Sequence, residues 1–418
     1  MFAVGFVAFA LAILISVSLH EAGHMITAKR FGMKVTKYFV GFGPTVFSFR
    51  RGETEYGLKL IPLGGFCKIV GMTPQDDDVD PADEPRAMWR FPVWKRTIVM
   101  ASGSVTHFLL ALVAMYFAAV AVGVQNPALP VTATEQREAP AQIQVGDCVQ
   151  INLRDNSPCA VGQNGDVKGP AAVAGLKTDD IITAINGKPI ANYGQLTDTI
   201  RSLPAGAAQF AYSRAGQPGT ATINLIAAQR PPLENPKGPV TQVAVAGINW
   251  TTTEPLTVTY GPVDAFGSVG QQTATIVSGT FAAMKRIPEK IPALWHSITG
   301  DERDPDTPIS VLGASRLGAE AAEAGLWEIF IGIFISLNVF IGIFNLLPLL
   351  PLDGGHIAIA WYERARSWLY SKLKRPDPGR VDYFKLMPLT YAVILIGGAF
   401  TLLTVTADVV NPISIFSR

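Results

Sequence analysis

Four long apolar stretches constrain the fold of this chain more than any other feature of its sequence. They cover residues 2–28, 98–124, 329–350 and 389–405, and the first of them continues through a polar motif near its end. Each approaches the roughly 20 apolar residues that a helix needs to cross the ~30 Å hydrocarbon core of a bilayer. We therefore expect a polytopic α-helical membrane protein with four transmembrane helices.

Composition agrees with a membrane protein. Only 16% of the 418 residues are charged, whereas soluble domains usually carry about 25%. The net charge of +1 offers no strongly basic surface, so we expect no nucleic-acid partner. A charged motif follows the first stretch instead of a signal-peptidase cleavage site, so we expect this stretch to be retained.

Lysine and arginine concentrate between the first and second stretches and between the third and fourth. By the positive-inside rule both of these segments are cytoplasmic. Both termini and the long middle segment are then extracytoplasmic. Cys67 is placed on the reducing side of the membrane, and Cys148 and Cys159 on the oxidising side, where a disulfide and two free thiols both remain open.

The first cytoplasmic segment completes an N-terminal membrane part, residues 1–124. Within it, residues 35–70 alternate β-forming residues with glycines around a polar turn at 50–55, which predicts a membrane-associated β-hairpin or sheet. Non-helical backbone at membrane depth survives only where it is buried in protein or lines a cavity. An ordinary cytoplasmic hairpin is the alternative.

The middle of the chain divides into two parts. Residues 125–235 alternate short strand-like runs with turns, and within them 169–200 predict a short helix, a strand, a tight turn and an amphipathic helix. Residues 236–325 form a connecting region. Within it, residues 263–298 show helical spacing, and Pro288 and Pro292 are expected to break the helix. A C-terminal membrane part, residues 326–418, follows.

The polar motif in the first stretch is His20-Glu21-Ala22-Gly23-His24. On a helix, residues i and i+4 share a face, so both imidazoles can bind one zinc ion while Glu21 acts as general base. A solvated helix just beyond the membrane is the alternative reading. A charged side chain inside a span costs about 2.5–3.5 kcal/mol on insertion scales, which favours a functional role.

A catalytic zinc needs a third protein ligand and an open position. Asp353 is the strongest candidate, because Pro348 and Pro351 break the third helix and present the carboxylate on irregular backbone. His356 is a competing ligand. Asn345 is a candidate for hydrogen-bonding a substrate backbone, or it terminates the helix.

These motifs, in this order, together with a PDZ-like module between the second and third spans, resemble the site-2 protease family. The resemblance is closest to bacterial members, including those of actinobacteria, that cleave anti-sigma factors. It implies a zinc metalloendopeptidase with one Zn²⁺ per chain in the bacterial plasma membrane, with its active site near the cytoplasmic side. Its implied partners are the lipid bilayer and single-pass membrane proteins, whose transmembrane segments it cleaves after an earlier trimming step.

The resemblance also assigns roles to particular residues. His20, His24 and Asp353 match the metal ligands of the family, and Glu21 matches its catalytic glutamate. Residues 125–235 match an inserted extracytoplasmic α+β PDZ-like domain, which either filters substrates by size or binds their new C-terminus.

Residues 35–70 resemble the re-entrant β-loop of the family, which pairs with an extended substrate. The substrate-binding residues expected from this match are Asn345, Gly43, Gly64 and Gly65.

The chain departs from the family pattern in two places. His107 stands where asparagine is typical, four residues after Gly103 in the second span. We expect it to hydrogen-bond near the site or to approach the metal, but we do not count it as a ligand. In the third span Leu350 replaces an expected proline and Pro351 follows it, while the spacing to Asp353 is kept.

Two other classes of protein are compatible with parts of the sequence. A non-enzymatic scaffold would explain the PDZ-like module but would leave the metal motifs without a role. A zinc transporter or sensor would explain the ligands but would leave Glu21 and the PDZ-like module unexplained.

Overall fold

The computed structural model describes residues 1–72, 79–130, 132–152, 159–233 and 238–416. These residues form two compact units. The membrane unit comprises Met1–Val124 and residues 259–416, and the inserted unit comprises Gln125–Val258. The strands after residue 240 thus pack with the inserted unit. The four-part division expected from the sequence remains a prediction, and each unit is described by itself.

The membrane unit is mainly helical. Its helices are α1 (Phe2–Arg30), α2 (Val93–Phe117) with a π-helical extension η3 (Ala118–Val122), α6 (Asp264–Thr299), α7 (Val311–Glu323), α8 (Trp327–Asn345), α9 (Asp353–Lys372) and α10 (Met387–Val410). Short 3₁₀ turns are η1 (Glu84–Arg86), η2 (Met88–Arg90) and η4 (Tyr383–Leu386).

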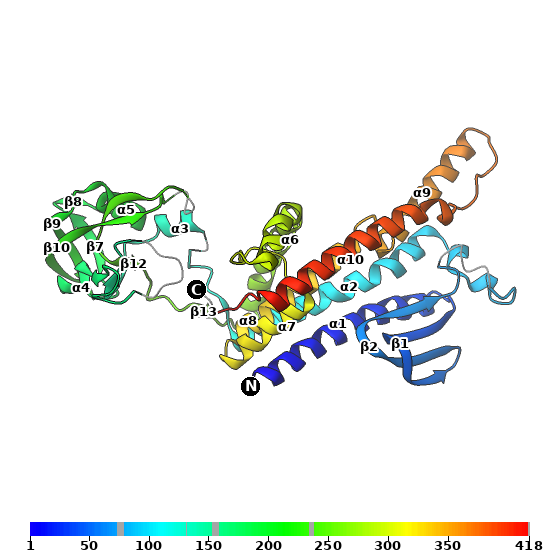
Figure 1. Cartoon of the computed structure of the whole chain (residues 1–418). Helices are drawn as coiled ribbons and strands as arrows, with labels where there is room; N and C mark the ends of the chain where they lie inside the picture. Colours follow the sequence, from blue (N-terminus) through cyan, green and yellow to red (C-terminus); the bar gives the residue numbers. More distant parts are fainter. Residues whose placement is uncertain (73–78, 131, 153–158, 234–237, 417–418) are drawn as a thin grey trace. The chain divides into compact units, whose positions relative to one another are not determined.

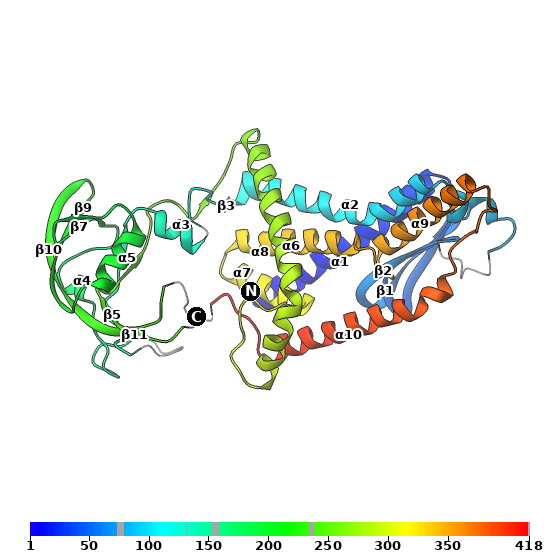
Figure 2. The same ribbon diagram turned by 90° about the horizontal axis from the view of Figure 1, so that it is seen from above.

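Four segments of this unit are long and apolar enough to cross a membrane, within the residues that the structure describes. They are Phe2–Arg30, Val93–Val122, Trp327–Asn345 and Tyr383–Val410. The four predicted spans are therefore confirmed as long apolar helices. In Figures 1 and 2, α1, α2 and α8 lie side by side, and α2 contacts both of the other helices.

Helix α6 runs crosswise to α2, α8 and α10 and contacts all three (Figure 2). The prediction that Pro288 and Pro292 break this helix is wrong, because α6 continues through both of them. Contacts near its C-terminal end stabilise the helix: Lys290, between the two prolines, pairs with Asp304 at 2.8 Å, and Leu294, beyond both, is fully buried. Tertiary contacts here offset the backbone hydrogen bonds that each proline removes.

A folded β-sheet packs against α1 (Figure 1). Strands β1 (Val35–Arg51) and β2 (Thr54–Ile69) are antiparallel, with several bulges. The first half of β1 pairs on one side with the end of β2, as Tyr38 does with Cys67, and on the other side with its start, as Tyr38 does with Tyr56. Two long strands thereby make four segments, and residues 65–69 form one edge of the sheet.

The inserted unit is an α+β structure (Figure 1). Its helices are α3 (Ala133–Glu138), α4 (Pro170–Val173) and α5 (Tyr193–Ser202). Its strands are β3 (Val124–Gln125), β4 (Ile143–Val145), β5 (Cys148–Val149), β6 (Val167–Lys168), β7 (Ile181–Ile185), β8 (Lys188–Pro189), β9 (Gly206–Arg214), β10 (Gln217–Arg230), β11 (Thr241–Val245), β12 (Ile248–Trp250) and β13 (Thr257–Val258). The main sheet has five strands in the order β11-β10-β9-β7-β8.

The core of the inserted unit lies between this sheet and α5. Phe210, Leu196 and Ile223 are fully buried there, and each such side chain contributes roughly 1.5–3 kcal/mol through burial. Cys148 and Cys159 form a disulfide with Cα atoms 5.9 Å apart. Of the two alternatives left open by the sequence, the structure therefore has the disulfide.

A buried ion pair holds two elements of the inserted unit together. Asp180 is fully buried and accepts two hydrogen bonds of 2.7 Å from Arg214 and one of 2.8 Å from the backbone of Lys177. Burial alone would raise the pKa of Asp180, but these three hydrogen bonds outweigh it and hold the pKa below its ordinary value. The carboxylate is thus fully paired.

Candidate metal centre

Three side chains from two helices converge in the membrane unit. His20 and His24 lie one turn apart on α1, and Asp353 is the first residue of α9. Both histidine Nε2 atoms lie 3.3 Å from Asp353 Oδ2 and 3.1 Å from each other. All three side chains are buried to more than four-fifths.

The geometry of this group fits a tetrahedral zinc site. Zinc binds imidazole nitrogen and carboxylate oxygen at about 2.0–2.2 Å, so neighbouring ligands in a tetrahedron lie roughly 3.3 Å apart. Among the residues that the structure describes, Asp353 Oδ2 is also buried without a hydrogen-bond partner. A buried carboxylate oxygen that faces two imidazole nitrogens is costly unless a cation joins them. The three residues therefore fit the metal that the sequence predicts.

One ligand is oriented by a neighbouring helix. His24 Nδ1 lies 2.7 Å from the carbonyl oxygen of Val99 on α2 and donates a hydrogen bond to it. This bond fixes the ring so that Nε2 keeps its lone pair for a metal.

Two glycines allow close packing around the candidate metal ligands. A Cβ atom on Gly103 of α2 would lie 2.5 Å from His20 Cε1 and 2.6 Å from His24 Nε2. A Cβ atom on Gly355, two residues after Asp353, would lie 2.6 Å from the Leu349 carbonyl carbon. Glycine at position 103 lets α2 pack directly against the two histidine rings, and glycine at position 355 lets the start of α9 pack against the turn that precedes Asp353.

Glu21 lies between the metal ligands and the β-sheet. Its carboxylate accepts a hydrogen bond from the backbone N–H of Cys67 on β2. A Cβ atom on Gly65 would lie 3.3 Å from Glu21 Cγ. The edge segment 65–69 of the sheet therefore runs past the expected general base.

The other predicted site residues lie at different distances from this centre. Asn345 is half-buried at the C-terminal end of α8. Gly43 and Gly64 have positive φ angles of 80° and 134° in the β-sheet, where any residue with a side chain is strained. His356 lies outside the metal-ligand group, with its ring against Tyr383.

Sequence reasoning missed two polar residues beside the metal centre. Ser16 on α1 and Asn338 on α8 are buried and hydrogen-bond His107, whose ring lies 5.1 Å from that of His20. An available signal was Asn338 itself, because an amide inside an apolar span needs a partner on another helix.

A second group of potential ligands lies in the inserted unit. Cys148, Cys159 and Asp166 are close enough to share an ion. Both sulfurs are already joined in the disulfide, so neither is a thiolate that binds metal. Within the described residues, the centre around His20 is the better metal site.

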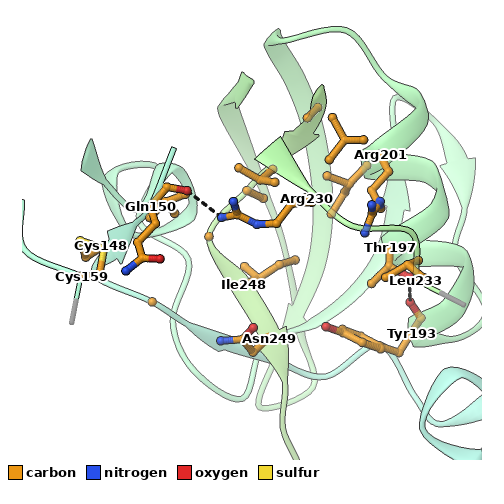
Figure 3. A pocket seen from close by; sticks show the side chains of 18 residues that line it. Cys148, Gln150, Cys159, Tyr193, Thr197, Arg201, Arg230, Leu233, Ile248 and Asn249 are labelled. Carbon is orange, nitrogen blue, oxygen red and sulfur yellow. Dashed lines mark hydrogen bonds between the residues drawn. A yellow bond between two sulfur atoms is a disulfide. The ribbon is translucent and has the colours of Figure 1, made fainter. Parts of the chain in front are cut away.

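The inserted unit also contains a pocket of about 380 Å³ between α5 and the end of β11 (Figure 3). Arg201 and Arg230 line one side of it, and the disulfide lies at one end. Arg201 donates a hydrogen bond to the Pro231 carbonyl, and Arg230 donates to the carbonyls of Gln229 and Gln150. Neither guanidinium forms an ion pair within the described residues. The pocket is therefore positively charged.

Membrane-spanning helices with a buried His-His-Asp group and an adjacent glutamate define the class of zinc metallopeptidases that act in the membrane. The model of peptidase family M50 matches residues 8–375, and the chain belongs to this family, the site-2 proteases. It is 41% identical to the zinc metalloprotease Rip1 of Mycolicibacterium smegmatis and 38% identical to that of Mycobacterium tuberculosis. Both alignments cover the whole of each chain.

The predicted class of enzyme is therefore confirmed. The chain is a zinc metallopeptidase of a membrane protease family, and the scaffold and transporter alternatives are set aside.

Proposed function

We propose that this chain binds one zinc ion through His20, His24 and Asp353 and cleaves transmembrane segments of single-pass membrane proteins. The observation that carries the proposal is the 3.1–3.3 Å triangle of ligand atoms, with a buried carboxylate oxygen that has no other partner. Zinc bound there would supply Lewis-acid chemistry to a water molecule and to the scissile carbonyl.

The general base is Glu21. It takes a proton from the attacking water and delivers it to the leaving amine, so that proton transfer is complete when the peptide bond breaks. The Cys67 N–H holds the carboxylate beside the ligand group. Helices α1, α2 and α9 enclose the site and exclude bulk water.

The β-sheet edge supplies the substrate contact. Residues 65–69 form an edge of the sheet beside Glu21, and an extended peptide can add to a sheet at such an edge as a further strand. An unwound transmembrane segment therefore adds to this edge. Gly43, Gly64, Gly65 and Asn345 are the residues that we assign to substrate binding.

The inserted unit is a PDZ-like domain that binds the C-terminal end of a trimmed substrate. Its pocket has the two guanidiniums, and burial together with the nearby Arg201 lowers the pKa of Arg230. A peptide C-terminal carboxylate matches this charge, which favours C-terminus binding over a purely steric filter. Pre-trimmed anti-sigma factors are the substrate class that follows from the family resemblance. In the topology that follows from the positive-inside rule, both termini and the PDZ-like domain are extracytoplasmic.

The first experiment compares the purified chain with its Glu21→Gln variant in detergent, using a truncated single-span substrate and a measurement of bound zinc. We expect about one zinc per chain in both proteins and cleavage by the parent alone, with a loss of about 10²–10⁴-fold. Glu289→Gln, at an exposed position of α6, is the matched control and should cleave normally. Undiminished cleavage by Glu21→Gln would show that another group is the base.

The pocket is tested by binding of substrate C-terminal peptides to the full chain. A free carboxyl end should bind more tightly than its amidated form, and Arg230→Met should remove this difference. Arg137→Met, at an exposed ion pair with Asp198, is the control. Equal binding of both peptide forms to the parent would leave the steric filter as the role of the unit.

A further inference from the structure

Three polar side chains meet beside the metal centre without a role in the chemistry described so far. Ser16 on α1, His107 on α2 and Asn338 on α8 are each at most 2% exposed. Polar groups inside a membrane bundle are expensive to bury and are retained where they bind something or hold helices in register.

The hydrogen bonds of Asn338 fix which nitrogen of His107 carries the proton. Asn338 Nδ2 donates to the Phe334 carbonyl at 2.8 Å, so its Oδ1 faces His107 and accepts. Oδ1 lies 2.8 Å from His107 Nδ1 and also accepts from the Ser16 hydroxyl. His107 Nδ1 is therefore the donor, and Nε2 keeps its lone pair.

His20 needs a hydrogen-bond acceptor. Its Nε2 faces the other two ligands, so its Nδ1 carries the proton. That Nδ1 is buried and has no hydrogen-bond partner in the described part of the chain, whereas His24 Nδ1 donates to the Val99 carbonyl. Metal-binding histidines almost always donate this second N–H to an acceptor.

The two rings lie at a suitable separation. The centroids of His20 and His107 are 5.1 Å apart. Two imidazoles joined edge to edge by an N–H···N bond of about 2.9 Å have centroids roughly 5 Å apart. The separation of the two rings therefore matches that of hydrogen-bonded imidazoles.

We propose that His107 Nε2 accepts the hydrogen bond of His20 Nδ1–H in the zinc-bound enzyme. His107 is then a positioning residue, held by Asn338 and Ser16. It orients the ring of His20, as the Val99 carbonyl orients the ring of His24. The inference rests on the zinc site proposed above.

The tautomers are read on the full-length protein, in detergent, with ¹⁵N-labelled histidine and with and without zinc. Only five histidines are present, and the spectrum of a His107→Gln variant assigns the His107 signals. We expect the Nδ1–H tautomer at His107 and a zinc-dependent shift at its Nε2. An Nε2–H tautomer, or an Nε2 signal that ignores zinc, would overturn the proposal.

Zinc affinity, measured by competition with a chromophoric chelator, gives an independent test. His107→Phe keeps a ring but no acceptor, and should weaken zinc binding about 10–100-fold. His107→Gln restores an acceptor and should recover most of this loss. Ser104→Ala on the same helix removes a buried hydroxyl that has no hydrogen-bond partner, and should leave zinc affinity unchanged.

The outcomes separate this inference from the proposal beneath it. If the parent binds no zinc, the metal site itself is wrong. If the parent binds zinc and His107→Phe binds it equally well, or His107→Gln binds it as weakly as His107→Phe, the positioning role is wrong. Should His107→Phe fail to fold, Asn338→Leu carries the affinity test, with a smaller expected loss because the ring remains.

Discussion

Two buried aspartates, one in each unit, show opposite ways of handling a charge away from water. Asp180 in the inserted unit receives three hydrogen bonds, two of them from a guanidinium. Asp353 in the membrane unit has an oxygen that faces two imidazole nitrogens. This oxygen receives no hydrogen bond within the described residues. The first arrangement stabilises a fold. The second arrangement is stable only with a cation, and so indicates a metal site.

The largest expected effect follows from Asp353→Asn, which preserves the side-chain volume and removes the charge. Zinc affinity should fall more than about 100-fold, since even residues behind the ligands contribute 10–100-fold, and cleavage should be lost. The zinc-free variant should be at least as stable as the zinc-free parent, because an unpaired buried carboxylate is gone. Chelator competition and thermal unfolding measure both effects, with Asp301→Asn, at an exposed aspartate, as control. A variant less stable than the zinc-free parent would contradict the comparison.

Removal of zinc by a chelator should destabilise one unit only. A ligand present at 100 times its dissociation constant stabilises the state that binds it by about 2.7 kcal/mol. Hydrogen exchange should therefore accelerate in α1 and α9 and stay unchanged in β9 and β10. Equal acceleration in both units would mean that the metal supports the whole chain.

Asp180→Asn should destabilise the inserted unit and leave the membrane unit unchanged. It leaves Arg214 without its carboxylate, and because Arg214 is partly exposed we expect a loss of about 2 kcal/mol, seen as faster hydrogen exchange in β7 and β9. Zinc content should not change. Asp198→Asn, at the exposed pair with Arg137, is the matched control and should cost less than about 1 kcal/mol.

Acid should produce the smallest effect, again in the inserted unit. The pKa of Asp180 is lower in the folded state than the value of about 3.9 expected when unfolded. Its contribution to stability is therefore fully present above the unfolded pKa and declines as the pH falls through the folded pKa. Hydrogen exchange in β7, compared between the parent and Asp180→Asn, should converge on acidification. A difference that stays constant down to the lowest accessible pH would contradict this reading.

Much of the fold was predictable because its signals are local. Apolar length predicts the four spans, and the alternation around residues 50–55 predicts the β1–β2 pair. The strand at 181–185 and the helix after it follow from turn chemistry and periodicity. The continuity of α6 through Pro288 and Pro292 was not predictable, because contacts distant in the sequence stabilise the end of that helix.

The same distinction applies to the site. His20, Glu21, His24 and Asp353 stand in recognisable motifs. The Val99 carbonyl contacts His24, and the Cys67 N–H contacts Glu21. The amide of Asn338 contacts His107, and all three contacts arise only from tertiary packing. Backbone groups carry no sequence signal, so no motif could have revealed the first two.

The proposed metal ligands lie on helices near opposite ends of the chain, α1 and α9. During synthesis the nascent chain therefore carries both histidines long before the aspartate leaves the ribosome. A chain that ends before residue 353 has an incomplete metal site and cannot hydrolyse peptide bonds. The order of the sequence thus prevents a partly synthesised chain from cleaving membrane proteins.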